Sequence, residues 1–197
     1  MKKMLTMKDI RQEGDPILRR RAEEVAMPLS QADYAILKSM MNYILNSQND
    51  ALAAEMDLRP AVGLAAPQIG VSKRMFCMNA FDEKGEVLHR YAFVNPKILS
   101  SSEEQCYVPG GEGCLSVDEE KNGLVPRAKR IKARAILVDL ETARVDEVIV
   151  KLSGFPAVVF QHEYDHLLGI LFIDKKKAEL PGIKPIEFVH EEEAQAE

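Results

Sequence analysis

Apolar residues recur at three- and four-residue spacing in the first third of the chain, the pattern of a helix with one buried face. The positions concerned are Ile36, Leu37, Met40, Met41, Ile44 and Leu45. Ser30, followed three residues later by Asp33, resembles a capping box with Asp in place of the usual Glu or Gln. We therefore expect an amphipathic helix over residues 31–49, with its methionines in the core, and a short helical turn over residues 51–57.

Beyond Gly70 the pattern becomes strand-like. Residues 73–79 and 87–94 are rich in apolar side chains and are separated by a turn around residues 83–85. Residues 129–139 alternate basic and apolar positions, as a half-exposed strand does, and a further predicted strand follows over residues 145–152.

Helical spacing returns over residues 155–168, and Gly169 stands where a C-terminal cap glycine belongs. This order of elements predicts an α+β fold, with small antiparallel sheets packed around a central helix. A chain of 197 residues is long enough for one well-packed domain. We expect a single domain over residues 1–197, with a flexible acidic tail from about residue 190.

Composition narrows the classes of function. The formal net charge of -5 gives no broad basic surface for nucleic acid, and we expect no sequence-specific nucleic-acid binding. No apolar run approaches the ~20 residues of a membrane span, and the N-terminus lacks an apolar stretch of signal-peptide length. We expect a cytoplasmic protein without a membrane contact. The three cysteines, Cys77, Cys106 and Cys114, are odd in number and irregularly spaced, which argues for reduced thiols.

The most specific local pattern is His162–Glu163–Tyr164–Asp165–His166. Residues four apart share one face of a helix, so His162 and His166 can bind one metal ion together. Glu163, beside the first of them, can reach a water in an open coordination position. The alternative is two surface histidines and a surface glutamate on a helix.

A catalytic site of this kind needs a third protein ligand. The position used by proteases with a third histidine after the glycine is Phe172 in this chain, which excludes that option. A downstream glutamate, Glu179 or Glu187, is one candidate. A cysteine is the other: Cys114 follows glycines that allow close approach of the backbone. The alternative for a lone cysteine is a small buried hydrophobe; we assign Cys77 to that category and leave Cys106 open.

Three motifs, GLAAPQIG at residues 63–70, EGCLS at 112–116 and QHEYDH at 161–166, resemble the signature motifs of peptide deformylases, in the same order and at similar separations. The resemblance extends over roughly residues 5–175, and the ALAAEMDLRP segment resembles the longer type 2 enzymes of Gram-positive bacteria. The family usually has glycine where this chain has Ala61, and a methyl group there could narrow the site or alter the loop.

The resemblance implies the chemistry residue by residue. Cys114, His162 and His166 would be the metal ligands, and Glu163 the general acid/base. Gln68 and the backbone N–H of Leu115 would stabilise the oxyanion; the alternative for Gln68 is to tie down its own loop. The implied reaction removes the formyl group from the N-terminal methionine of newly made polypeptides and releases formate. Fe(II) is the expected cofactor, with Ni(II), Co(II) or Zn(II) possible.

The substrate site is expected beside the metal. Phe155, Val158 and Val159 can form an apolar wall for the methionine side chain, although plain helix packing would also explain them. The resemblance implies that the peptide adds as a strand along the backbone of Val62, Gly63, Leu64 and Gly113. We also expect Glu112 to pair with Arg127 and hold the EGCLS segment. The partners implied are formyl-methionyl nascent peptides and a transient ribosome contact, for a monomeric enzyme.

Two other classes of function compete with this interpretation. Zinc endopeptidases are the proteins in which the HExxH pattern is most common, but this chain lacks the third histidine. A metal-stabilised binding protein near the ribosome exit would fill all four coordination positions and would need neither Glu163 nor Gln68. Cleavage of unformylated peptide chains would distinguish the first of these from a deformylase.

Overall fold

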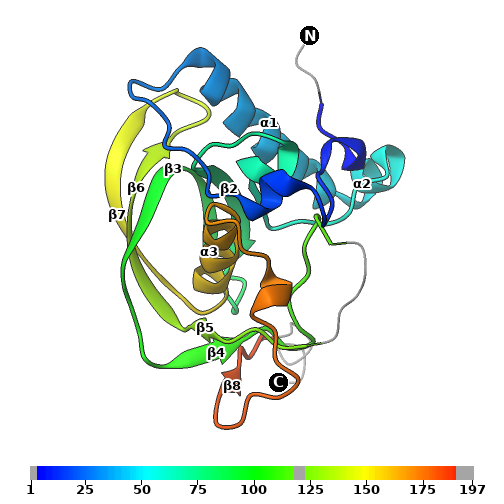
Figure 1. Cartoon of the computed structure of the whole chain (residues 1–197), viewed down its shortest axis with the longest axis vertical. Helices are drawn as coiled ribbons and strands as arrows, with labels where there is room; N and C mark the ends of the chain where they lie inside the picture. The colour runs from blue at the N-terminus through cyan, green and yellow to red at the C-terminus, as the bar shows by residue number, and fades with distance from the viewer. Residues whose placement is uncertain (1–3, 118–122, 190–197) are drawn as a thin grey trace, which may run out of the picture.

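A computed structural model describes residues 4–117 and 123–189 of the chain. Figure 1 shows one helix, α3, in the middle of the molecule, with the strands of a curved sheet passing around it. The helices are α1 (Gln31–Ser47), α2 (Asp50–Met56) and α3 (Gly154–His166). The strands are β1 (Gly63–Ala65), β2 (Met75–Phe81), β3 (Leu88–Ser101), β4 (Gln105–Tyr107), β5 (Arg127–Ala128), β6 (Arg130–Val138), β7 (Val145–Ser153) and β8 (Lys184–Pro185).

The strands form two sheets. The larger is antiparallel throughout, with the strand order β1-β2-β3-β6-β7, and the smaller has the order β5-β4-β8. The predicted α+β fold, with small sheets around a central helix, is confirmed. One detail differs from the expectation, because the short strands β4 and β8 pair in parallel.

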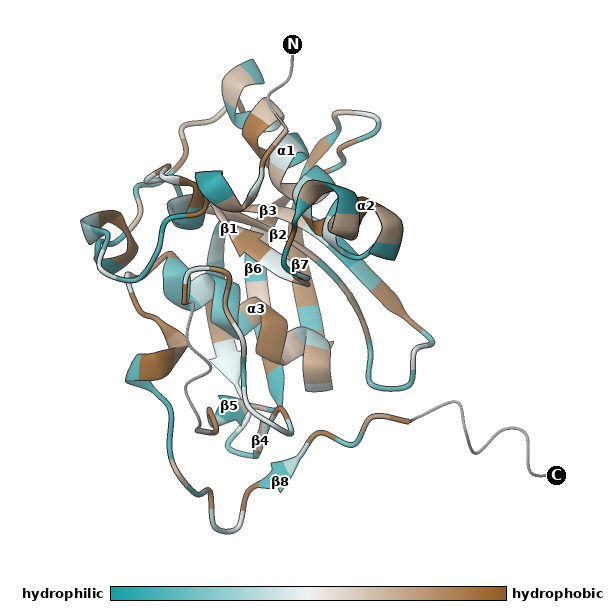
Figure 2. Ribbon diagram, turned by 90° about the vertical axis from the view of Figure 1, so that its right-hand side faces the viewer, coloured by the Kyte–Doolittle hydropathy of each residue, from teal (hydrophilic) through white to brown (hydrophobic). Residues whose placement is uncertain are grey.

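The helix α3 is held against the large sheet by aromatic side chains. The ring of Phe160 on α3 meets the ring of Phe76 on β2 edge to face, with centroids 5.1 Å apart. It meets Phe93 on β3 in the same way at 5.4 Å. All three side chains are fully buried, and such pairs stabilise by about 0.5–1.5 kcal/mol beyond their buried area. Figure 2 shows α3 lying against this sheet.

The first helix follows its sequence pattern closely. Ser30 Oγ accepts a hydrogen bond from the backbone N–H of Asp33 at 3.1 Å and donates to the Asp33 carboxylate at 2.8 Å. Ser30 thus caps the helix, but as a single N-cap and not as the predicted reciprocal capping box. Met40 and Met41 are buried in the core, as expected. The helix ends at Ser47, two residues before the predicted end, and α2 provides the short helical turn that was predicted next.

The start of α3 depends on a residue distant in the sequence. Ser153, at the cap position, makes no side-chain cap, and the carboxylate of Glu83 from the β2–β3 turn accepts from the backbone N–H of Phe155 at 3.3 Å. Gly154 has a φ of +59°, and a Cβ there would lie 2.3 Å from Glu83. Only glycine therefore permits this approach. The helix ends at His166, short of the predicted residue 168, and Gly169 lies in the following turn at φ +75°.

The strand β3 runs through Asn95–Pro96, a dipeptide that would be expected to end it. Asn95 has a φ of +50°, and the register with β6 shifts between Val94 and Lys97, which marks a bulge. The Asn95 side chain accepts from the backbone N–H of Val25 at 2.8 Å and donates to its carbonyl at 2.9 Å. The bulge thus fastens the N-terminal segment to the sheet, and β3 continues to Ser101 instead of the predicted residue 94.

Among the described residues, no helix is long and apolar enough to cross a membrane. The acidic tail predicted to be flexible from about residue 190 lies outside the described residues.

Candidate metal centre and adjoining cavity

Three side chains from two separate parts of the chain converge at one point. Potential ligand atoms of Cys114, His162 and His166 all lie within 4.8 Å of one another, and the Cys114 Sγ is 3.4 Å from the His166 Nε2. Both histidines lie on α3, four residues apart, and their ring centroids are 5.0 Å apart. Cys114 comes from the segment before β5, and it is 8% exposed. One thiol and two imidazoles at this separation fit a single borderline divalent metal ion.

The orientation of His162 is fixed by a buried carboxylate. Glu112 Oε2 lies 2.8 Å from the His162 Nδ1, which leaves Nε2 as the ring nitrogen free for a ligand role. Hydrogen bonds of this kind orient metal-binding imidazoles. Burial alone would raise the pKa of Glu112, but Arg127 and His162 outweigh it and lower the pKa to about 2. Glu112 is therefore an ionised acceptor at neutral pH.

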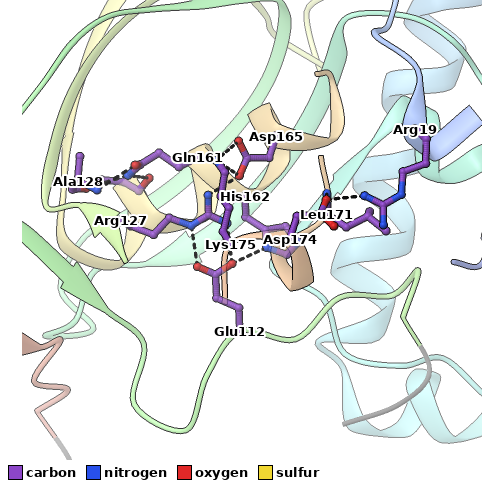
Figure 3. Close-up of polar contacts among 11 residues, drawn as sticks. Arg19, Glu112, Arg127, Ala128, Gln161, His162, Asp165, Leu171, Asp174 and Lys175 are labelled. Atoms are coloured by element: carbon purple, nitrogen blue, oxygen red, sulfur yellow. Dashed lines mark hydrogen bonds and ion pairs between the residues drawn. The ribbon is translucent and has the colours of Figure 1, made fainter. Parts of the chain in front are cut away.

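Arg127 connects the cysteine segment to the helix (Figure 3). It donates from Nε and Nη2 to the two carboxylate oxygens of Glu112, both at 2.8 Å, and from Nη1 to Asp165. Lys175 donates to the same Asp165 at 2.7 Å. The predicted pairing of Glu112 with Arg127 is confirmed. The link to Asp165 was not predicted, because an aspartate inside HEYDH gives no sign of which side it faces.

Glu163 is buried beside the ligand group, with 3% of its surface exposed. Its Oε2 has no hydrogen-bond partner among the described residues. Burial raises the pKa of Glu163 to about 7, and the nearby Glu112 adds to this rise. A Cβ added to Gly63 on β1 would lie 2.3 Å from Glu163 Oε1. The carboxyl group therefore rests against the backbone of β1, and its second oxygen is available for a substrate or a water.

Gln68 uses the two ends of its amide differently. Its Oε1 accepts from the backbone N–H of Ala65 at 2.8 Å, so the side chain does tie down its own loop. Its Nε2 lies 3.5 Å from the Cys114 Sγ and 3.3 Å from the Ser116 Oγ. The hydrogen bond from Ala65 fixes the orientation of the Gln68 amide, so the N–H donors of its Nε2 are held next to the ligand group.

A cavity of about 360 Å³ opens beside these residues, within the range of small-molecule sites. Of the residues expected to bind substrate, Leu64 alone does not border it, because its side chain is fully buried in the core. The residues considered in the sequence that do border it are Ala61, Val62, Gly63, Gln68, Glu112, Gly113, Cys114, Leu115, Phe155, Val158, Val159, His162 and Glu163. Ala61 thus borders the cavity, and whether its methyl group narrows the site stays a prediction.

Arg59 is a contributor that the sequence did not reveal. Its guanidinium donates to the backbone carbonyls of Cys114 at 3.2 Å, Leu115 at 3.4 Å and Val117 at 3.3 Å. From the loop before β1, it thus holds the backbone of Cys114 and of the residues that follow it. Arginine followed by proline in a loop carries no periodic signal, so only the three-dimensional structure shows this role.

The remaining candidate ligands lie elsewhere. Glu179 and Glu187 are not part of the ligand group. Cys77 is fully buried in β2 and Cys106 is buried in β4, and burial raises the pKa of both thiols, that of Cys106 to about 11. The assignment of Cys77 to core packing is confirmed, and Cys106 belongs with it.

The two histidines of an HExxH helix meet a cysteine from another segment, next to a buried glutamate and an apolar cavity, and this combination defines a metal-dependent hydrolase. A family model described as polypeptide deformylase matches residues 7–180. The chain belongs to this family, whose members are metal-dependent enzymes that remove the N-formyl group from newly made polypeptides.

Comparisons with individual proteins point to the same family. A peptide deformylase 2 of Bacillus cereus is 50% identical over 182 residues, which cover 92% of this chain and 96% of the relative. A peptide deformylase of Halalkalibacterium halodurans is 52% identical over 172 residues, covering 87% and 91%. Among solved structures, a class I type b peptide deformylase from Acinetobacter baumannii with Met-Ala-Ser bound matches with a TM-score of 0.65 at 31% identity, covering 89% of this chain and 99% of that chain.

Proposed function

We propose that this chain removes the formyl group from N-terminal formylmethionine with Cys114, His162 and His166 as metal ligands and Glu163 as the general acid/base. The observation that carries this proposal is the convergence of the thiol and two imidazoles near Glu163 and the Gln68 amide, beside an apolar cavity. A purely structural metal site would need neither of these two polar groups.

The donor set narrows the choice of metal. One thiolate and two imidazoles favour borderline or soft ions over Mg²⁺ or Ca²⁺. We propose Fe(II) as the resident ion, with Ni(II), Co(II) and Zn(II) as ions that the same ligands can hold. When bound, such an ion supplies Lewis acidity and brings the pKa of a water ligand toward neutrality.

Glu163 is placed to move the proton. Its Oε2 is buried and has no partner among the described residues, and the carboxyl group borders the cavity. It can take the proton of the attacking water and later deliver it to the amine nitrogen that leaves with the peptide. General acid–base catalysis of this kind contributes ~10²–10⁴ in rate.

We assign two N–H groups, Gln68 Nε2–H and the Leu115 backbone N–H, to stabilise the oxyanion that forms from the formyl oxygen. Gln68 Nε2 is held by the contact of its own Oε1 with Ala65, and Leu115 follows the cysteine ligand directly along the chain. Arg59 holds the carbonyls on either side of the Leu115 N–H, which limits rotation of that peptide unit. Each donor of this kind contributes roughly 3 kcal/mol to the lowering of the barrier.

The apolar part of the cavity suits a methionine side chain. Phe155, Val158 and Val159 border it from α3. The edge strand β1 pairs with β2 on one side only among the described strands. A peptide can therefore add along Val62, Gly63 and Leu64, with Gly113 opposite, so that the sheet gains a strand.

We further propose a cytoplasmic monomer, folded as one domain, that acts on nascent chains during a transient contact with the ribosome. The support is indirect: the deformylase reaction has its substrate on new polypeptides, and the net charge of -5 disfavours a stable complex with RNA.

The test is formate release from formyl-Met-Ala-Ser by protein prepared with Fe(II) without oxygen, or with Ni(II) in air. Glu163→Gln is the matched variant, with metal content measured for both proteins. Release that depends on metal, and that falls by at least about 10² in the variant at unchanged metal content, supports the assignment. No release from protein that holds one metal ion would contradict it, and cleavage of unformylated peptide would indicate an endopeptidase.

A further inference from the structure

A second cavity, of about 490 Å³, lies away from the proposed active site and shares no lining residue with it. It is bordered by the N-terminal segment, the residue before β2, the bulge of β3, β6, β7 and Tyr164 of α3. Its lining residues are Arg21, Ala22, Glu24, Arg74, Asn95, Pro96, Lys97, Arg134, Ala135, Ile136, Glu147 and Tyr164.

Arg74 is the unusual member of this lining. Its side chain is 94% buried (6% exposed), and it makes no ion pair with a carboxylate in the part of the chain that the structure describes. Its Nη2 donates to the Pro96 carbonyl at 2.9 Å, and its Nη1 has no hydrogen-bond partner there. The guanidinium carbon lies 5.5 Å from the centroid of the Tyr164 ring. A buried cation without a counter-charge is costly, and proteins normally pair such groups.

The other charged side chains of the cavity add to the positive charge of Arg74 instead of cancelling it. Four cationic side chains line the cavity (Arg21, Arg74, Lys97 and Arg134) against two acidic ones (Glu24 and Glu147), a difference of two positive charges. Lys97 and Arg134 are direct cross-strand partners, and like charges in that arrangement are destabilising. Glu147 lies 3.5 Å from Arg134, but both side chains are more than half exposed, so the pair is weak.

We propose that this cavity binds an anion that carries a phosphate group. A phosphate monoester has a charge of about -1.5 to -2 near neutral pH, which matches the excess of two positive charges better than a single carboxylate does. Guanidinium groups bind phosphate oxygens through paired N–H donors. The cavity is larger than one phosphate, and Ala22, Ala135, Ile136 and the Tyr164 ring give it an apolar side, so the ligand is a small organic phosphate.

The test is calorimetric titration of the Ni(II)-loaded protein, after removal of free metal, with inorganic phosphate and with AMP. Adenosine and acetate serve as controls without a phosphate group. Lys97→Gln removes an exposed lining charge and is expected to weaken phosphate or AMP binding by about tenfold. Lys151→Gln, on the exposed face of β7 and outside the cavity, is the matched control and should leave binding unchanged.

Arg74→Met is the stronger variant and should abolish binding, provided that its circular dichroism and melting temperature show a folded protein. Tighter binding of AMP than of inorganic phosphate would support a small organic phosphate as the ligand, and equal or weaker binding of AMP would overturn that assignment. The proposal is overturned if neither probe binds, or if binding is unchanged in Lys97→Gln, because the anion would then be held elsewhere, for example at the metal. Acetate binding as tightly as phosphate would also overturn it.

Discussion

Gly63 on β1 and Glu163 on α3 lie so close together that a side chain at residue 63 would overlap the Glu163 carboxyl group. A Cβ at residue 63 would lie 2.3 Å from Oε1 of Glu163 and 2.7 Å from its Cδ. The proposed proton carrier is thus positioned by the absence of a side chain on the neighbouring strand. Glycine is required at the first position of the GLAAPQIG motif because a side chain would overlap Glu163, and not because of an unusual backbone angle.

The substitution Gly63→Ala is therefore expected to displace the Glu163 carboxylate without removing a metal ligand. The turnover number for formate release should fall by roughly 10²-fold or more, as for loss of general acid–base catalysis, while metal content stays at one ion per chain. The control is the double variant Gly63→Ala/Glu163→Gln. If both changes act through one carboxylate, the double variant is no slower than Glu163→Gln alone, and additive losses would contradict the steric argument.

The ion pair between Arg127 and Glu112 is expected to contribute to stability because both side chains are about 95% buried or more. Arg127→Ala removes the buried cation that Glu112 and Asp165 share, so Glu112 keeps only His162 and Asp165 keeps only Lys175 as a partner. The free energy of unfolding in urea should therefore fall by about 3–5 kcal/mol. Metal affinity should fall as well, since Glu112 orients His162.

Arg130→Ala provides the matched control for that experiment. Its pair with Glu104 has a similar length, 2.7 Å, but both side chains are about half exposed. A change of only ~0–1 kcal/mol is expected there. If Arg127→Ala cost no more than Arg130→Ala and left metal content unchanged, the proposed holding role of Arg127 would have to be abandoned.

Asp33 is expected to make stability depend on pH at the acid end. Burial alone would raise its pKa, but the hydrogen bonds from Lys73 and Ser30 outweigh it and lower the pKa below 3.8. Because the folded-state pKa is the lower one, the stabilisation is present above the unfolded-state pKa and is lost as pH falls through the folded-state value. Asp33→Asn should therefore cost on the order of 1 kcal/mol at pH 7 and progressively less below about pH 4.

Urea unfolding of both proteins between pH 7 and pH 3 measures this difference directly. Other carboxylates also protonate in this range, so the quantity that matters is the gap between the two curves. A gap that stays constant with pH would show that Asp33 acts only through its cap geometry with Ser30.

Removal of the metal is expected to lower stability, because the ion binds the folded arrangement of Cys114, His162 and His166 and not the unfolded chain. At a free metal concentration 1,000 times the dissociation constant the loss is about 4 kcal/mol. Differential scanning calorimetry with and without a chelator tests this. In Cys114→Ala the response to chelator should be much smaller, and an equal response would place the metal elsewhere.

The parts of the fold that the sequence predicted are those with local causes. Helical spacing and the Ser30 cap predicted α1, and the HEYDH pattern predicted the helix face that carries both imidazoles. The five-stranded sheet was only partly predicted, because the three residues of β1 are too few to show alternation and are extended by pairing with β2.

The supporting contacts of the site had no local cause that could be detected in one sequence. Arg59 and Asp165 act on segments more than 35 residues away, and neither has a pattern around it that indicates a direction. The same holds for Glu83 at the start of α3. Pairings of this kind are set by tertiary packing, which the sequence alone does not display.

The burial of two of the three thiols has a practical consequence. Cys77 and Cys106 lie in strands, away from solvent and with raised pKa, whereas Cys114 borders the cavity. An alkylating reagent should therefore react at a stoichiometry of one per native chain, and a bound ion should shield that position. The rate of labelling thus reports occupancy, so the fraction of metal-loaded molecules in a preparation can be counted without a turnover assay.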